Sequence, residues 1–404
     1  MTEDEAYRSS TQYRLWSFAP TSLASLRATT NDLAAHRVRA AIRRAREARS
    51  NGDLTPDVTG DGSSSNDAGK DGVDGMPGSG ELDDIDCLTV DEDLKLVGYY
   101  CAKAMDLADF CSFPTNVKAT AVQYLKRFYL SNSPMTYHPK LIMPCALFLA
   151  TKTENHYTPL SAFAAKFGSS PEDVIAPELL VVQGLRFSFD VRHPFRALEG
   201  GFMELLAMAA GTPGLARDRP ADELRTQLRG LPPAKTDQHG AEKPQDVVNR
   251  IRTAHGRAKD VLKTAALLTD AYFLATPAHV WLAALLAVDA PLARFYVDAK
   301  VPQEDVHAKL LATLEPLAAL LADAPSSTTP GKEEVREAKR IDKKLFYCSN
   351  PEKEGVKGAV AAGARKRDGE GEGSEEERAR KKRKEERERG QREGEGVFGG
   401  PLAK

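Results

Sequence analysis

Two short stretches of this sequence are apolar on every side of a helix, and each lies in the middle of a block of amphipathic helical segments. They are LIMPCALFLA at 141–150 and VWLAALLAV at 280–288. A helix that is apolar all round needs other helices around it. Both stretches fall well short of the roughly 20 residues that cross a bilayer. We therefore predict two helical bundles, each built around one of these central helices.

The segments around each central stretch have helical rather than strand periodicity. No convincing alternation of period two or Asn-Gly hairpin turn occurs between them. The first block, 88–190, is predicted to hold helices at 90–109, 115–130, 139–153, 160–167 and 171–185. The second block, 191–323, is predicted to hold helices at 195–210, 245–274, 277–288, 292–297 and 303–321. The fold class is all-α, with two five-helix bundles in tandem.

Further helices flank the two blocks, and low-complexity segments separate them. The N-terminal segment, 1–49, holds an amphipathic helix over 21–48, and a C-terminal helix is predicted over 331–347. Three segments have too few apolar residues to repay the entropy lost on ordering. They are a flexible linker at 50–87, a loop insert at 211–243 and a disordered charged tail at 348–404.

Composition narrows the class of protein. The chain is 41% hydrophobic and 28% charged, which fits neither a wholly disordered protein nor a membrane protein. Its 56 Lys and Arg balance 58 Asp and Glu, so a surface that binds nucleic acid throughout is not expected. The polar first sixteen residues do not resemble a signal peptide. Five cysteines without a C-x-x-C pair favour a reducing, intracellular compartment.

No catalytic or metal-binding pattern stands out. The eight histidines form no H-x-x-x-H or H-E-x-x-H pair, and the glycine-rich segment near 62–69 has the wrong spacing for a phosphate loop. We therefore predict no catalytic residue, no metal site and no cofactor.

The charged tail contains one basic cluster with a candidate role. The sequence RARKKRK at 378–384 includes a possible nuclear-import signal. The candidate residues are Arg380, Lys381, Lys382, Arg383 and Lys384. A solvated tail is the alternative, and the interleaved glutamates argue against direct binding of nucleic acid.

Several motifs of the first and second blocks resemble a known family. YLKRFYL, YHPKLIM and FLATKTE in 121–155, followed by LRFSF and LTDAYFLATP, resemble the cyclin box and, within the cyclin family, the cyclin H subgroup. The resemblance covers about 9–48 and 88–345. It implies that the two five-helix blocks are tandem cyclin folds.

The resemblance also implies a kinase-binding site in the first block. In cyclins, a Lys near the end of the third helix and a Glu on the fifth contact the mobile helix of the kinase, and the matching residues here are Lys152 and Glu178. The residues that match the apolar pocket for a kinase side chain are Leu149, Val182, Phe187 and Phe189. By itself, the charged pair would be a surface salt bridge of little energetic value. A further matching position, Leu141, is expected inside the bundle.

The sequence departs from the family at several positions. The Arg and Asp that many cyclins pair inside the box are replaced by Val97 and Lys126, and the docking patch of cell-cycle cyclins becomes LVGYY at 96–100. Pro144 and Pro177 fall inside predicted helices, where proline costs about 3 kcal/mol. A restart at Pro177 would move Glu178 from its family position.

The implied function is a non-catalytic nuclear cyclin that binds and activates a cyclin-dependent kinase. If the resemblance to cyclin H holds, the partners are the kinase catalytic subunit, a third assembly subunit and the general transcription and repair factor complex, with no membrane or direct nucleic-acid contact. The processes would be RNA polymerase II transcription, cell-cycle control and nucleotide-excision repair. The alternatives are a cyclin C-like Mediator cyclin and a TFIIB-like tandem cyclin-fold protein that binds DNA.

Overall fold

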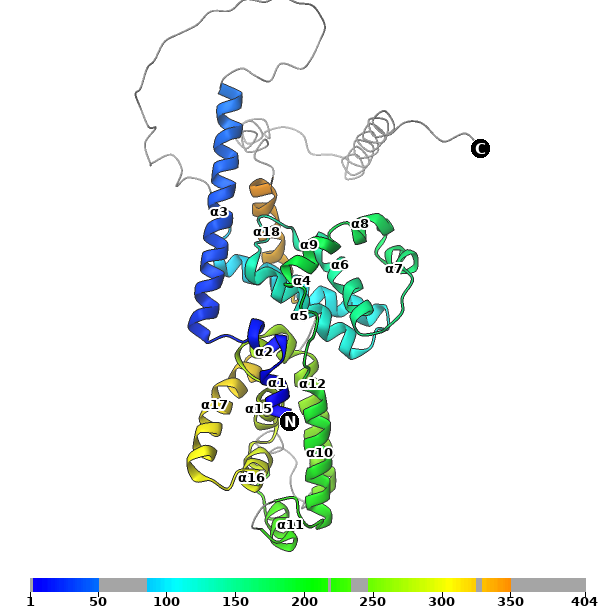
Figure 1. Ribbon diagram of the computed structural model, residues 1–404, viewed down its shortest axis with the longest axis vertical. Helices are drawn as coiled ribbons and strands as arrows, with labels where there is room; N and C mark the ends of the chain where they lie inside the picture. Colours follow the sequence, from blue (N-terminus) through cyan, green and yellow to red (C-terminus); the bar gives the residue numbers. More distant parts are fainter. Residues whose placement is uncertain (1–2, 51–85, 217–218, 234–245, 325–328, 350–404) are drawn as a thin grey trace, which may run out of the picture. The chain divides into compact units, whose positions relative to one another are not determined.

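The computed structural model describes residues 3–50, 86–216, 219–233, 246–324 and 329–349 (Figure 1). Every regular element in these ranges is an α-helix, as the sequence predicts. Most of the predicted linker, the end of the predicted insert and the tail with its basic cluster lie outside the described residues. None of the described helices is long and apolar enough to cross a membrane.

The first group of helices surrounds α6, which contains the first apolar stretch. Its members are α4 (Val90–Phe110), α5 (Thr115–Ser131), α6 (Pro139–Thr153), α7 (Leu160–Phe167), α8 (Pro171–Ile175) and α9 (Glu178–Gly184). Every α6 residue from Cys145 to Thr151 is buried, and α6 packs against α5, α4, α8 and α9. The single helix predicted over 171–185 is wrong: α8 ends before Pro177, which has no N–H to continue the ladder.

The second group surrounds α15, which contains the second apolar stretch. Its members are α10 (Phe195–Ala210), α11 (Ala221–Arg229), α12 (Val247–Lys263), α13 (Ala265–Leu268), α14 (Ala271–Leu274), α15 (Pro277–Val288), α16 (Ala290–Lys300) and α17 (Glu304–Ala322). Helix α15 starts at a hydroxyl cap, where the Thr276 side chain accepts a hydrogen bond from the His279 backbone N–H, and Pro277 follows at the first helical position.

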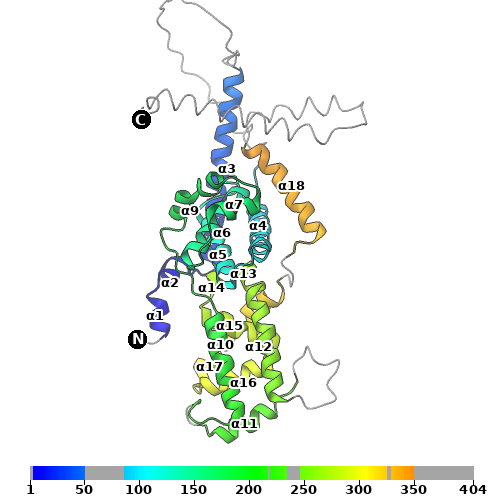
Figure 2. The ribbon, with the colours of Figure 1, turned by 90° about the vertical axis from the view of Figure 1, so that its right-hand side faces the viewer.

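The single helix predicted over 245–274 is also wrong, because it breaks where it meets the first group. Thr264 has φ −123° and ψ −80°, and Thr269 is extended. The buried Lys126 of α5 donates hydrogen bonds to the carbonyls of Leu267, at 3.3 Å, and Thr269. These bonds satisfy carbonyls that the break removes from the helix ladder. Figure 2 accordingly shows α13 and α14 between the two groups.

A charged side chain next to this break also fastens the N-terminal helix. The carboxylate of Asp270 accepts two hydrogen bonds from the Arg27 guanidinium of α3 (Pro20–Ser50), at 2.8 and 2.7 Å. The Lys126 ammonium lies 3.9 Å from the same carboxylate. The amphipathic helix predicted over 21–48 is thus confirmed, and it is tied to both groups.

The insert predicted as a loop over 211–243 is partly helical. Residues Ala221–Arg229 form α11, which packs on α10 and α16 and buries Leu224 and Leu228. The loop prediction is wrong here because the flanking Pro, Gly and charged residues masked a two-leucine, i to i+4 pattern in a nine-residue helix. The helix therefore belongs to the core of the second group.

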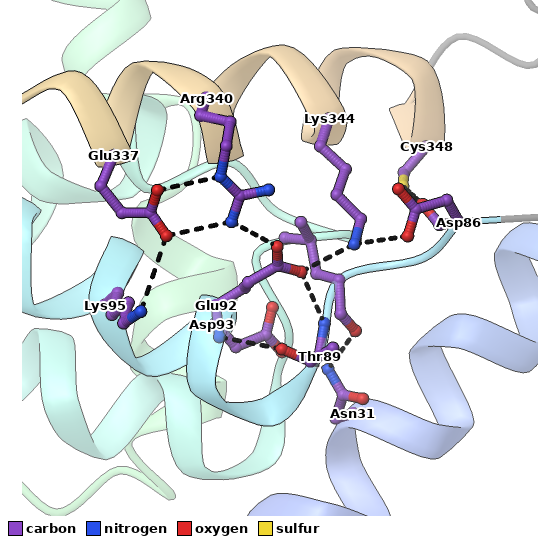
Figure 3. Close-up of polar contacts among 11 residues, drawn as sticks. Asn31, Asp86, Thr89, Glu92, Asp93, Lys95, Glu337, Arg340, Lys344 and Cys348 are labelled. Atoms are coloured by element: carbon purple, nitrogen blue, oxygen red, sulfur yellow. Dashed lines mark hydrogen bonds and ion pairs between the residues drawn. The ribbon is translucent and has the colours of Figure 1, made fainter.

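Helix α18 (Lys332–Ser349) packs on the start of α4 through a polar cluster (Figure 3). The Glu92 carboxylate accepts hydrogen bonds from Arg340, at 2.7 Å, and Lys344, at 2.8 Å. Glu92 also caps the Thr89 backbone N–H. Cys87, the last residue of the predicted linker, and Cys348, the first residue of the predicted tail, are both buried at this place.

Glu92 and its neighbour Asp93 have opposite pKa shifts. Burial opposes the charge of Glu92, but the hydrogen bonds from Lys344, Thr89 and Arg340 outweigh it and lower its pKa to about 2. Burial and the charge of Glu92 raise the pKa of Asp93 to about 6, although Asp93 accepts hydrogen bonds from Asn31 and Ser133.

The two carboxylates should therefore respond to pH in opposite senses. The stability that ionised Glu92 contributes is present above pH 4.5 and is lost as the pH falls toward 2. Neutral Asp93 contributes stability below pH 4, and this is lost as the pH rises through 6. In melting curves from pH 2 to 8, we expect Asp93→Asn to gain stability relative to wild type as the pH rises from 4 to 6, and to keep that gain above pH 6. The deficit of Glu92→Gln should shrink toward acid. A pH-independent difference for Asp93→Asn would contradict the assignment.

Candidate functional site

Lys152 and Glu178 lie side by side on the surface of the first group. Lys152 is in the last turn of α6, Glu178 is the first residue of α9, and the Lys152 Nζ lies 2.5 Å from the Glu178 Oε1. Their side chains are 42% and 23% exposed. The Lys152 ammonium also sits 4.8 Å from the centroid of the Phe148 ring. An exposed pair of this kind adds about 0 to 1 kcal/mol to fold stability, so stability gives little reason for its position.

Two features of the sequence bring α9 to this position. Pro177 separates α8 from α9 and leaves Glu178 at the N-terminus of α9, where the helix dipole favours a carboxylate. Gly184 lets α9 approach α5 closely, because a Cβ at that position would meet the Phe128 ring at 2.5 Å. The restart at Pro177 therefore does not separate Glu178 from Lys152.

The chain after α9 has an unusual backbone that exposes an aromatic ring. Arg186 and Phe187 both lie in the left-handed region, with φ of 52° and 53°. Such residues cost about 1 to 3 kcal/mol each when they are not glycine. The Phe187 N–H donates to the Val182 carbonyl at 3.0 Å. The Phe187 side chain is 67% exposed, so this strained turn presents an apolar ring to solvent.

The four residues predicted to line an apolar pocket do not share one environment. Leu149 is buried in the core and is 5% exposed, while Val182 and Phe189 are partly buried against the core. The Tyr124 hydroxyl donates to the Phe189 carbonyl at 2.8 Å. Of the four, only Phe187 is largely open to a partner.

Two exposed leucines extend this surface. Leu141 is 64% exposed, so the expectation that it lies inside the bundle is wrong. It is eleven residues before Lys152 on α6, which is about three turns and hence the same side of the helix. Leu179, next to Glu178, is 66% exposed and was missed by sequence reasoning. Four consecutive apolar residues at 179–182 in so short a helix were the available signal, because they cannot all face the core.

We call these residues the α6/α9 face. Its members are Leu141, Lys152, Glu178, Leu179 and Phe187. An ammonium with three donors and a carboxylate acceptor, together with exposed apolar side chains on the same two helices and on the turn after α9, are suited to docking a protein backbone. Among the described residues, no group of three or more His, Cys, Asp or Glu side chains is placed to hold a metal ion.

A buried arginine behind this face fixes the chain that follows Phe187. The Arg127 guanidinium donates to the carbonyls of Ser188, at 3.5 Å, and Asp190, at 3.1 Å. It also donates to the Gln12 side chain of α2 (Thr11–Trp16) at 3.3 Å, and lies 5.2 Å from the Trp16 ring centroid. Burial lowers the pKa of Arg127 to about 10, so it remains charged at neutral pH. The buried Gln12 and Trp16 thus dock α2, which follows α1 (Glu3–Arg8), on the first group.

Comparisons with known proteins agree on one family. A model described as the cyclin N-terminal domain matches 105–190, and one described as the cyclin C-terminal domain matches 193–322. The chain is 28% identical over 309 residues to Cyclin CCL1 of Saccharomyces cerevisiae, covering 76% of this chain but 63%, less than two thirds, of that protein. It is 30% identical over 265 residues to Cyclin mcs2 of Schizosaccharomyces pombe, covering 65% of this chain and 69% of that protein.

Two solved complexes contain chains of similar structure. One is the CAK complex of Chaetomium thermophilum bound to ATP-gamma-S, with a TM-score of 0.63, 30% identity, and coverage of 92% of this chain and 100% of that chain. The other is the yeast TFIIK complex (Kin28/Ccl1/Tfb3), with a TM-score of 0.50, 25% identity, and coverage of 78% of this chain and 100% of that chain.

Proposed function

This chain belongs to the cyclin family, and from that premise we propose that it is the regulatory subunit of a cyclin-dependent kinase of the CDK-activating type. Its two helical groups contain the cyclin N-terminal and C-terminal domains. The observation that carries the proposal is the α6/α9 face, where an exposed Lys–Glu pair and apolar side chains that the core leaves uncovered occur on the same two helices and the turn after α9.

The proposed mechanism is positional. Lys152 and Glu178 bond the backbone of the kinase's mobile helix, and Phe187, Leu179 and Leu141 bury apolar surface against it. Fixing that helix aligns the kinase's own Lys–Glu pair and catalytic Asp. The cyclin contributes no reacting group and needs no cofactor.

The proposed partners are the kinase catalytic subunit, a third assembly subunit and the general transcription and repair factor complex. The CAK and TFIIK complexes support this assignment, because the similar chains in them are part of kinase assemblies. The role in RNA polymerase II transcription follows from the likeness to TFIIK, while roles in cell-cycle control and nucleotide-excision repair extend the proposal. No feature of the described residues favours the Mediator or TFIIB-like alternatives.

We propose the nucleus as the site of action, in keeping with a transcription-factor complex. The candidate import residues, Arg380, Lys381, Lys382, Arg383 and Lys384, lie outside the described residues. Import through the kinase partner is the alternative.

The test is affinity purification of the full chain, followed by identification of the bound kinase and a phosphotransfer assay. We expect a cyclin-dependent kinase to co-purify, and the purified chain to have no phosphotransfer activity alone but to stimulate that kinase strongly. Phosphotransfer by a preparation shown to be free of kinase, or the absence of any such kinase among the bound proteins, would contradict the proposal.

A further inference from the structure

Two cysteines from distant parts of the sequence meet where α18 packs on the start of α4. Cys87 lies two residues before the Thr89 cap of α4, and Cys348 is in the last turn of α18. Both are buried, at 8% and 6% exposed, and both are free thiols. The Cys348 thiol donates to the carbonyl of Asp86, the residue directly before Cys87, with the sulfur 4.0 Å from the oxygen, and the Cys87 thiol donates to the Ala35 carbonyl of α3 at 3.9 Å. Figure 3 shows Cys348 beside Asp86 at the end of α18.

The surroundings distinguish the two sulfurs. Hydrogen bonding by the Cys348 thiol lowers the pKa of Cys87 to about 7; the positive charges of Arg39 and Lys344 act in the same direction, while burial and the Asp86 carboxylate oppose them. The same hydrogen bond, together with burial, raises the pKa of Cys348. Cys87 is therefore the better nucleophile at neutral pH.

The other three cysteines do not have a lowered pKa. Burial raises the pKa of Cys101 and Cys145 to about 12, and it also raises the pKa of Cys111. Thiols whose pKa is raised by apolar surroundings are inert. Of the five cysteines, Cys87 alone has a lowered pKa, and Cys348 is the second thiol beside it.

We propose that Cys87 and Cys348 are a redox-active dithiol, a modification site at which a hydroperoxide closes a disulfide between α18 and the segment that leads into α4. The end of α18 and the segment before α4 already meet here, because the Cys348 sulfur lies 4.0 Å from the carbonyl oxygen of the residue directly before Cys87. The bond would fasten α18 covalently where Glu92 already holds it through Arg340 and Lys344.

The chemistry balances in two steps. The Cys87 thiolate attacks one oxygen of the hydroperoxide, the O–O bond breaks, and the leaving oxygen takes a proton to become an alcohol or water, which leaves a sulfenic acid on Cys87. The Cys348 sulfur then attacks the Cys87 sulfur, the S–O bond breaks, and the hydroxide leaves as water with the Cys348 proton. In total, two thiols are oxidised, one peroxide is reduced, and a dithiol reductant reverses the change.

The experiment treats the full-length chain with hydrogen peroxide under native conditions and maps disulfide-linked peptides by mass spectrometry. We expect a Cys87–Cys348 linked peptide in the wild type and in the matched control Cys111→Ser, and none in Cys348→Ser. The Cys348→Ser variant should instead accumulate a sulfenic acid at Cys87 that a cyclic diketone traps. The linked form should melt at a higher temperature than the reduced form and return to it with dithiothreitol.

Alkylation of the wild-type chain measures the reactivity of Cys87 without relying on a variant that could fold poorly. With iodoacetamide, Cys87 should react at least tenfold faster than Cys101, with a half-maximal rate near pH 7. Equal rates at these two cysteines would overturn the proposal. The proposal would also be overturned if no Cys87–Cys348 peptide formed, or if it formed no faster than disulfides between the other cysteines. In either case, circular dichroism must show that the treated chain is still helical.

Discussion

Replacing Lys152 by alanine is expected to weaken kinase binding by about 2 to 5 kcal/mol, while the melting temperature of the isolated chain stays nearly unchanged. The lysine is 42% exposed and its one described ion-pair partner, Glu178, is also at the surface, so the fold loses little. In the complex, by contrast, a desolvated backbone carbonyl of the kinase would be left without a donor. The measurement is a binding titration with the purified kinase beside a melting curve.

The matched control is Lys166→Ala, which removes an exposed lysine of α7 outside the α6/α9 face and should leave binding at the wild-type level. Glu178→Ala should weaken binding as well. A double-mutant cycle of Lys152 and Glu178 then separates their own ion pair from their contacts with the kinase. Wild-type affinity in both single variants would refute the assignment, and so would a loss of binding that follows a lowered melting temperature.

Replacing Arg127 by methionine is expected to lower the free energy of unfolding by about 2 to 5 kcal/mol. The methionine keeps most of the apolar stem but removes the donors to the carbonyls of Ser188 and Asp190, while the Gln12 side chain keeps only its hydrogen bond from the Arg192 backbone N–H. Each buried acceptor left without a donor costs about 1 to 3 kcal/mol. Because Arg127 also fixes the chain after Phe187, kinase binding should weaken together with stability. Chemical denaturation of the full chain measures the change.

Arg186→Met is the control for this experiment. Arg186 is exposed and lies 5.4 Å from the same Trp16 ring, so it shares the cation–π contact of Arg127 without its buried hydrogen bonds. Its replacement should cost no more than about 1 kcal/mol. Similar losses in the two variants would show that contact with Trp16, rather than the buried hydrogen bonds, accounts for the effect.

Helical periodicity predicted the elements that depend on a segment's own residues. The all-α class and the central positions of α6 and α15 follow from the two apolar stretches, and the start of α15 follows from Thr276 and Pro277. The pairing of Lys152 with Glu178 could be predicted because the resemblance to cyclins assigned both residues to one site. Sequence alone could not show that Leu141 and Leu179 are exposed, since an apolar residue on the packed side of a helix has the same local pattern.

The tertiary structure decided every feature that joins distant segments. The helix predicted over 245–274 breaks where it meets the first group, and Lys126, far away in the sequence, donates hydrogen bonds to the carbonyls that the break leaves free. Asp270 and Arg27, like Cys87 and Cys348, become neighbours only after the helices pack. Periodicity tells which residues of one helix share a side, but it carries no information about the side chain that will lie opposite them. Which side chains become neighbours depends on the packing of the whole core, because a buried charge is stable only when it is paired and hydrogen-bonded.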